Sequence, residues 1–207
     1  MAQRTYGGVT SAERRARRRK ALTDAALDLV ADGGWDRVTV RAVCVRARLN
    51  DRYFYESFPD RDALLLATRD DIAADALRTL RRTIEHTSPD ARVRAVVEAG
   101  IDFFIADPRR GHLMFAPHEA LRGRRREMLR TLSRIVADQA TEILGERAAP
   151  RKDRELGALT LVSGTLEVFV SWLRGELDVT REHLADFLVA MVNTTGDLAT
   201  ALRRERG

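Results

Sequence analysis

A segment about a quarter of the way along the chain combines cations, amides and aromatic rings in a pattern suited to binding a polyanion. The segment is "ARLNDRYFYESF", residues 47–58. It has cations at Arg48 and Arg52, an amide at Asn50, an acid at Asp51, and aromatic rings at Tyr53, Phe54, Tyr55 and Phe58. Guanidinium groups bind phosphates and guanine edges, and tyrosine hydroxyls donate hydrogen bonds to phosphate oxygens. A short helix cannot bury four aromatic rings at this spacing, so we expect some of them to face solvent or a ligand.

The basic charge is concentrated at the N-terminal end. The 207 residues have 36 basic and 31 acidic side chains, a formal net charge of +5. Residues 1–20 hold seven basic side chains and one acidic side chain, so the remaining residues sum to −1. A nucleic acid is the natural partner of such a run, with the arginines at 14, 15, 17, 18 and 19 on the backbone or in the minor groove. The alternative is a solvated, disordered tail.

Several classes of protein are disfavoured by what the sequence lacks. Cys44 is the one cysteine, so an internal disulfide framework is excluded and a reducing cytoplasm is expected. The sequence shows no run of 18 apolar residues and no secretion signal, so we expect no membrane partner. It contains no Gly-rich phosphate loop, HExxH, CxxC or GxSxG motif, so we expect neither an enzyme nor a cofactor. Cys44 falls on the buried side of a predicted helix and is interpreted as packing.

Helix signals dominate the chain, and they predict an all-α protein of about nine helices. Thr39 and Asn50 are expected to cap two short helices, and Thr180 a long one. The predicted helices cover residues 11–34, 39–47, 50–58, 60–85, 89–106, 108–116, 118–144, 151–176 and from 180 to beyond Leu202.

The last two predicted helices have apolar faces wide enough to need a partner surface. Gly157, Gly164 and Ser171 recur every seven residues, which lets another helix approach closely. Phe187 and Met191 belong to the apolar stripe of the final helix. We expect a homodimer formed through this pair, since soluble oligomers are usually two-fold symmetric. The alternative is packing within one monomer.

Two short helices joined by a three-residue turn, after a supporting helix, predict a helix-turn-helix. The helices can cross at small or apolar side chains, namely Val43, Cys44, Ala47, Leu49, Phe54 and Phe58. The outward face would present Arg41, Asn50, Asp51, Arg52, Tyr53 and Tyr55. In such a unit the second helix enters the major groove of DNA.

The segment "TVRAVCVRARLNDRYFYESFPDRDALL", residues 39–65, resembles the DNA-binding domain of the TetR family of bacterial transcriptional regulators. The resemblance extends specifically over residues 11–65 and elsewhere by helix layout, including "WLRGELDVTREHLADFL" near the end. It implies a flexible basic arm at 1–10, a helix-turn-helix domain at 11–59 and an effector-binding and dimerisation domain at 60–207. It also implies a homodimer that reads a near-palindromic, double-stranded DNA operator, commonly as a repressor released by a small apolar effector.

Roles follow for the side chains of the DNA-binding domain. Arg41, Arg52 and Tyr53 are expected to read bases, and the alternative for Arg41 is a solvated surface arginine. By resemblance, Tyr55, Thr39 and Arg61 contact phosphates. Asn50 is expected to cap its helix rather than touch phosphate, and Asp51 to favour the helix N-terminus.

The sequence departs from the family in the turn, where Arg48 replaces the usual glycine. If Arg48 adopts a left-handed conformation, it costs on the order of 1 kcal/mol and adds a cation at the DNA surface. Arg52 and Tyr53 replace the usual small residues, so no operator sequence can be carried over from relatives.

The resemblance implies an effector pocket in the middle of the chain. Its candidate lining residues are Phe103, Phe104, Met114, Phe115, Met128, Phe169 and Trp172, although for any single one of them ordinary core is the better interpretation. His112 and His118 do not share a helical face across Pro117, so we expect no metal site. A helical interaction scaffold that does not bind DNA is the main alternative function, but it gives no reason for cations and tyrosines to cluster at residues 39–61.

Overall fold

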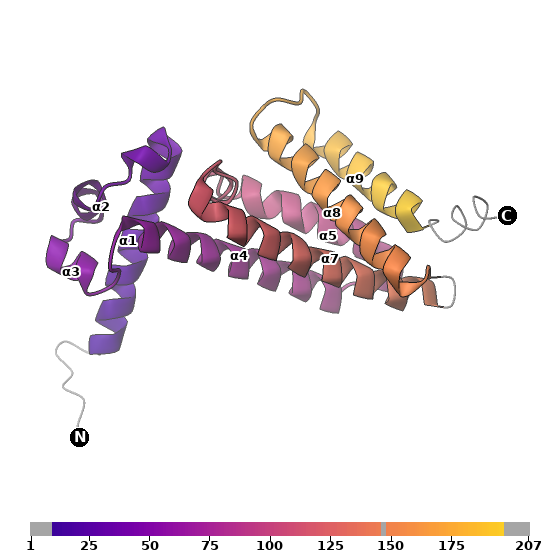
Figure 1. The fold of residues 1–207 in the computed structure, drawn as a ribbon, viewed down its shortest axis with the longest axis horizontal. Coiled ribbons are helices and arrows are strands. Elements are labelled where there is room, and N and C mark those ends of the chain that lie inside the picture. The colour runs from indigo at the N-terminus through magenta and orange to yellow at the C-terminus, as the bar shows by residue number, and fades with distance from the viewer. Residues whose placement is uncertain (1–9, 146–147, 197–207) are drawn as a thin grey trace, which may run out of the picture. The chain divides into compact units, whose positions relative to one another are not determined.

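The computed structural model describes residues 10–145 and 148–196. In this part of the chain it is all-α, with nine α-helices and two 3₁₀ turns (Figure 1). The α-helices are α1 (Ser11–Gly33), α2 (Val40–Ala47), α3 (Asp51–Tyr55), α4 (Arg61–Glu85), α5 (Pro89–Ile105), α6 (Arg109–Met114), α7 (Arg122–Leu144), α8 (Arg151–Leu173) and α9 (Arg181–Gly196). The 3₁₀ turns are η1 (Trp35–Arg37) and η2 (Glu119–Leu121). The expected basic arm, apart from Thr10, and the apolar positions Leu198 and Leu202 lie outside the described residues.

Side-chain caps fix where the helices begin. The Thr10 hydroxyl accepts a hydrogen bond from the Glu13 amide while the Glu13 carboxylate accepts one from the Thr10 amide, a capping box at the start of α1. The Asp60 carboxylate caps α4 by accepting from the Ala63 amide at 2.7 Å. The Thr180 hydroxyl accepts from the His183 amide at 3.1 Å, as predicted for the last helix.

Several helix boundaries differ from the sequence prediction: the helix expected over 50–58 ends at Tyr55, and the helix expected over 108–116 ends at Met114. Turn geometry explains two further differences. The helix expected from residue 118 begins at Arg122, because the 3₁₀ turn η2 occupies the preceding residues and the Leu121 amide donates to the His118 carbonyl. The helix expected to reach residue 176 ends at Leu173. Gly175 has a φ of 72°, a left-handed conformation that ends the helix and that glycine adopts without a steric penalty.

The chain divides into two compact units. The first unit comprises residues 1–75 and 107–121, and the second comprises 76–106 and 122–207. Residues 61–75 of α4 and the whole of α6 therefore belong to the same unit as the helix-turn-helix.

The core of the first unit is built on α1. Helices α2, α3 and α6 and the turn η1 all pack against this helix. Its inward face consists of Leu22, Ala25, Ala26, Leu27 and Val30, all buried. They pack with the buried side chains Trp35, Val38, Val43, Phe54, Phe58, Leu64, Leu65, Leu113 and Met114 of this unit. One aliphatic and aromatic core thus holds the short helices in place.

The second unit is a bundle in which α5 packs on α9, and α8 packs on both α7 and α9. α8 has a mean hydropathy of 1.6 over its most apolar 18 residues, so by length and composition alone it could span a membrane. Charged residues at its N-terminal end and Glu167 interrupt the apolar sequence of this helix, so it contains no run of 18 apolar residues. Within the bundle only 22% of that window is buried. The exposed apolar side chains include Leu156, Leu159, Phe187 and Met191 on α8 and α9.

Candidate nucleic-acid interface

Residues 40–55 form the predicted helix-turn-helix. The Thr39 hydroxyl accepts from the Ala42 amide at 3.1 Å and starts α2, while Asn50 Oδ1 accepts from the Tyr53 amide at 3.2 Å and starts α3. Both predicted caps are confirmed, and three residues connect the two helices. Arg48 is the C-cap of α2, and its backbone has φ 55° and ψ 41°. The left-handed conformation considered for Arg48 is therefore present, and its side chain points a cation away from the core.

The aromatic side chains divide between the core and the surface. Phe54 is fully buried and Phe58 is 3% exposed, whereas Tyr55 is 60% exposed. The Phe54 ring lies edge-on to Tyr55, with 5.4 Å between the ring centroids. Phe54 and Phe58 therefore anchor α3, and the anchored helix presents Tyr55 to the exterior.

Arginines of α1 fasten α3 to its supporting helix. The Arg18 guanidinium lies 4.4 Å from the centre of the Tyr53 ring, and the Arg19 guanidinium lies 4.4 Å from that of Phe58. Arg18 also pairs with Glu56 at 3.7 Å. The sequence interpretation placed Arg18 and Arg19 among possible DNA contacts, but the structure half-buries both of them against α3. Arg15 and Arg17 of the same run are exposed.

The basic side chains of the outward face differ in whether a carboxylate pairs with them. Among the described residues, no hydrogen bond or ion pair engages the exposed side chains of Arg41 and Arg48. Arg52 pairs with Glu56 at 3.0 Å, and Arg61 pairs with Asp62 at 3.1 Å. Exposed pairs such as these contribute little and can exchange for a phosphate. The face therefore offers Arg41 and Arg48 directly to an anion.

Cys44 belongs to the core of the helix-turn-helix, as the sequence predicted. Its side chain is 3% exposed. Burial, with a smaller contribution from the Asp51 carboxylate, raises the pKa of the Cys44 thiol to about 11. The thiol is therefore protonated at neutral pH, which suits packing and not nucleophilic attack.

An ion-pair network ties α2 and α6 to α1. The Asp28 carboxylate of α1 accepts from Arg109 of α6 and lies 3.4 Å from Arg46 of α2. Arg109 also donates to both oxygens of Asp107, at 2.8 Å each. This pairing raises the pKa of Arg109 and lowers that of Asp107. This network could not be predicted from the sequence, because Asp28, Arg46 and Arg109 are far apart along the chain.

The aromatic and methionine residues predicted to line an effector pocket do not form one group. Met114 is buried in the first unit, and Phe115 belongs to that unit as well. In the second unit Phe104 packs on Phe103 and Phe169, with centroids 5.1 and 5.4 Å apart, and Phe169 is 6.2 Å from Trp172. Met128 is half-buried on α7.

A cavity of about 290 Å³ lies elsewhere in the second unit. Its walls are mainly aliphatic, and none of the seven predicted residues lines it. Among the described residues no cluster of histidine, cysteine and carboxylate side chains is arranged to hold a metal ion. His118 instead stacks on Trp35, with ring centroids 4.0 Å apart and planes 10° from parallel.

Comparisons with known proteins find similar sequences for the N-terminal part of the chain. Residues 22–68 match the model of the bacterial regulatory proteins of the tetR family. The HTH-type transcriptional regulator BetI of Burkholderia mallei is 37% identical over 87 residues, which span 41% of this chain and 45% of that protein. BetI of Cronobacter sakazakii is 33% identical over 88 residues, again 41% of this chain and 44% of that protein. The matched segment thus spans less than half the length of these relatives.

Solved structures share the fold over most of the chain. A TetR-like transcriptional regulator from Rhodococcus sp. RHA1 has a TM-score of 0.68 at 20% identity, covering 84% of this chain and 93% of that one. The fatty acid degradation regulator FadR from Bacillus halodurans has a TM-score of 0.69 at 16% identity, covering 88% and 94%. Residues 22–68 thus match the tetR family of bacterial regulatory proteins, and most of the chain has the fold of solved TetR-like regulators.

Proposed function

We propose that the protein is a transcriptional regulator that binds double-stranded DNA through α2 and α3. The observation that supports this most directly is the exposed face of residues 39–61. Arg41, Arg48 and Tyr55 are all exposed there, while Phe54 and Phe58 are buried and anchor the segment. A rigid helix that displays unpaired guanidinium groups and a tyrosine hydroxyl suits the major groove and its flanking phosphates.

The side chains would divide the work of binding. Arg41 reads a base edge, with Arg52 and Tyr53 as further base contacts. Arg48, Thr39, Tyr55 and Arg61 hold phosphates, and the Thr39 hydroxyl can donate its proton while it caps α2. Asn50 caps α3, and Asp51 sits in the first turn of that helix, where its charge favours the helix dipole.

The functional unit would be a homodimer formed through α8 and α9. Leu156 and Leu159 on α8 are 65% and 45% exposed, and Phe187 and Met191 on α9 are 47% and 43% exposed. A Cβ placed on Gly164 would meet no atom within 4 Å, so a second chain can approach closely there. Burying these apolar side chains favours association. The dimer would read two half-sites about one helical turn, roughly 34 Å, apart on a near-palindromic operator.

Regulation would come from a small effector that binds the second unit. Such a molecule changes DNA affinity only if it binds the DNA-competent and DNA-free states with different affinity. We propose that the protein represses transcription in the bacterial cytoplasm and that effector binding releases it from the DNA. The match of residues 22–68 to the bacterial regulatory proteins of the tetR family supports this regulatory scheme.

Selection from a random DNA pool tests the DNA-binding function without knowledge of the target gene. The full chain is expected to enrich a near-palindromic sequence, and a footprint on that sequence should cover two half-sites. Recovery of unrelated sequences, with weak binding to all of them, would instead favour a helical scaffold that binds no operator.

A further inference from the structure

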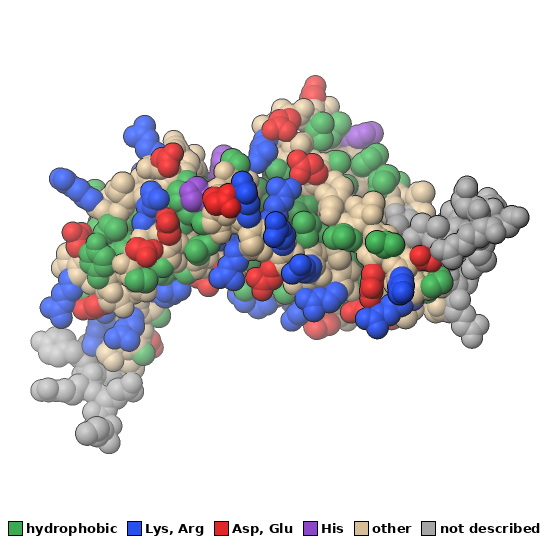
Figure 2. Space-filling view, in the orientation of Figure 1, with side chains coloured by type: hydrophobic (Ala, Val, Ile, Leu, Met, Phe, Trp, Pro, Cys, Tyr) green, Lys and Arg blue, Asp and Glu red, His purple; other side chains and the backbone are tan. Residues whose placement is uncertain are grey.

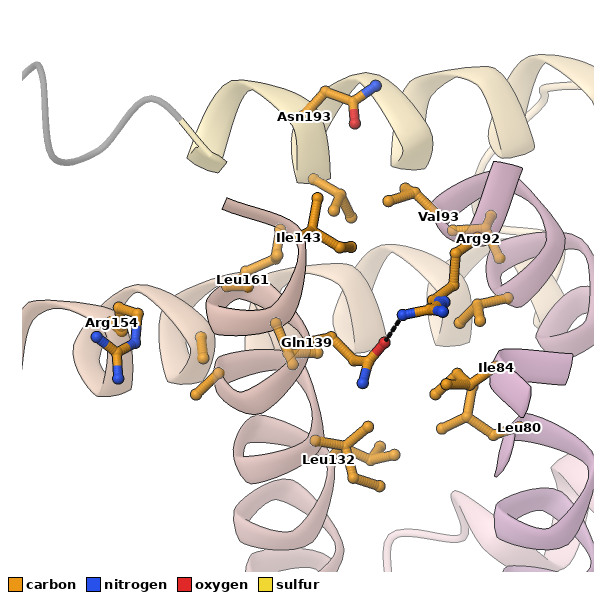
Figure 3. A pocket seen from close by; sticks show the side chains of 18 of the residues that line it. Leu80, Ile84, Arg92, Val93, Leu132, Gln139, Ile143, Arg154, Leu161 and Asn193 are labelled. Atoms are coloured by element: carbon orange, nitrogen blue, oxygen red, sulfur yellow. Dashed lines mark hydrogen bonds between the residues drawn. The ribbon is translucent and has the colours of Figure 1, made fainter. Parts of the chain in front are cut away.

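The cavity of the second unit has walls from α4, α5, α7, α8 and α9 (Figure 3). Most of its lining is aliphatic, including Leu80, Ile84, Val93, Leu132 and Leu161. Four polar residues interrupt that lining, namely Arg92, Gln139, Arg154 and Asn193. Among the described residues no carboxylate lines the cavity, so the polar part of this lining consists of two cations and two amides. Such walls accept an apolar body and favour a negative group over a positive one.

Arg92 already has its charge balanced. Its side chain is buried, and its Nη1 donates to Gln139 Oε1 and Glu142 Oε1, both at 2.8 Å, while Nη2 donates to the Thr87 carbonyl at 3.3 Å. The Glu142 carboxylate has its pKa lowered by this guanidinium, as expected for an ion pair. Arg92 Nε is buried without an acceptor. Arg92 therefore suits an uncharged oxygen better than a second anion.

Arg154 differs because its charge is not balanced. Its Nη1 donates to the Ala149 carbonyl at 2.7 Å, and its Nε is buried without an acceptor. No carboxylate of the described residues pairs with this guanidinium. A carbonyl satisfies one N–H group but leaves the positive charge uncompensated.

We propose that this cavity binds an amphipathic carboxylate, with its head on Arg154 and its apolar chain along the aliphatic walls. The inference rests on the proposed function, since it gives the chemical class of the effector. Figure 3 shows Arg92 and Arg154 on different helices on opposite sides of the view, with Leu161 between them and Ile84 and Leu80 beyond. The guanidinium of Arg154, which no carboxylate of the described residues pairs with, thus identifies the side of the cavity where the carboxylate of the ligand would bind.

The size of the cavity limits the ligand. A volume of 290 Å³ corresponds to about ten atoms the size of a water oxygen, at roughly 30 Å³ each. Octanoate has this number of non-hydrogen atoms and a single carboxylate, so it is a suitable probe. 1-Octanol has the same chain without the charge.

Calorimetric titration of the full chain, in the absence of DNA, tests the proposal. Octanoate is expected to bind one per chain and at least tenfold tighter than 1-octanol. Arg154→Gln should abolish this preference by weakening octanoate at least tenfold while leaving 1-octanol nearly unchanged. Arg151→Gln is the matched control, because Arg151 lies one turn earlier on α8, is exposed and pairs with Glu155 at 2.8 Å.

Equal affinity for the acid and the alcohol, or binding of neither, would overturn the inference, and this comparison requires no variant. A preference that survives Arg154→Gln in the folded protein would also overturn it. Because the titration contains no DNA, its outcome is independent of operator binding. Octanoate binding by a chain that selects no DNA sequence would leave the cavity assignment standing and refute the regulatory function.

Discussion

Arg48 combines a backbone penalty with a functional side chain. Its φ of 55° is unfavourable for any residue with a Cβ, so Arg48→Gly should raise the free energy of unfolding by up to about 1 kcal/mol. The same substitution removes a cation from the proposed DNA face, so operator affinity should fall and its salt dependence should flatten. Urea denaturation and DNA titrations at several salt concentrations measure the two effects.

Arg48→Ala separates these two contributions. It removes the cation but keeps a Cβ in the left-handed conformation, so affinity should fall without a gain in stability. If Arg48→Gly binds DNA as tightly as the wild type, Arg48 does not contact the DNA.

The buried Cys44 thiol makes stability depend on alkaline pH. Its folded-state pKa of about 11 lies above the ordinary value of 9.0, so the unfolded chain releases this proton first as pH rises. The associated stability is complete below pH 9 and is lost as pH rises toward 11. Between pH 8 and 10.5 the free energy of unfolding should fall more steeply in the wild type than in Cys44→Ala. Identical pH dependence in both proteins would mean that the thiol ionises normally.

At the scale of elements, a single capping side chain sets the start of α3. Asn50→Ala should lower the free energy of unfolding by about 1 kcal/mol, because the Tyr53 amide loses its acceptor. Asn50→Asp keeps the cap and should restore most of the stability, while it places a negative charge at the DNA face. Chemical denaturation measures the first effect, and loss of DNA affinity in folded Asn50→Asp measures the second. Equal stability of all three proteins would show that the cap is not required.

The elements of the helix-turn-helix were accessible from the sequence because their signals are local. Thr39 and Asn50 determine the helix starts through side-chain hydrogen bonds over three residues, and the spacing of Phe54 and Phe58 determines which rings are buried. Helix ends were less predictable: η2 and the early end of α8 depend on turn geometry that competes with helical periodicity.

Features that depend on tertiary packing were not accessible from the sequence. Arg18 and Arg19 belong to a charge run that suggested solvent or DNA, but the rings they cover lie about 35 to 40 residues away along the chain. The cavity forms where aliphatic side chains of five helices fail to fill the space between them, so no single helix shows it. Aromatic residues were conspicuous in the sequence, yet those of the second unit pack on one another instead.

At the scale of the whole molecule, acidic and basic side chains are interspersed over the surface shown in Figure 2, and apolar side chains emerge in the region of α8. This mixture of charges agrees with the sequence, because the chain is nearly neutral outside residues 1–20. A surface of interspersed charges gives no reason for the exposed leucines of α8. A second copy of the chain would cover these leucines.

Phe187→Asp should convert the proposed dimer into a monomer, because a carboxylate would have to be buried in an apolar interface. Operator affinity should fall by at least about 100-fold, since each monomer then binds a single half-site. Ile105→Asp is the control: Ile105 is 42% exposed on α5 and is outside the proposed interface. Analytical ultracentrifugation at micromolar concentration should find a monomer for Phe187→Asp and a dimer for Ile105→Asp. A wild-type monomer would refute the dimer at once.

The most direct test of DNA binding by α2 and α3 is a titration of the selected operator, and of the DNA upstream of the protein's own gene, at several salt concentrations. Wild type, the double variant Arg41→Ala with Tyr55→Ala, and the control Arg81→Ala on the exposed side of α4 are compared by fluorescence anisotropy. We predict sequence-selective binding by wild type and control, with a loss of about 100-fold or more in the double variant. Equal binding by a folded double variant, or wild-type binding that is indifferent to sequence, would contradict the assignment of this face to DNA.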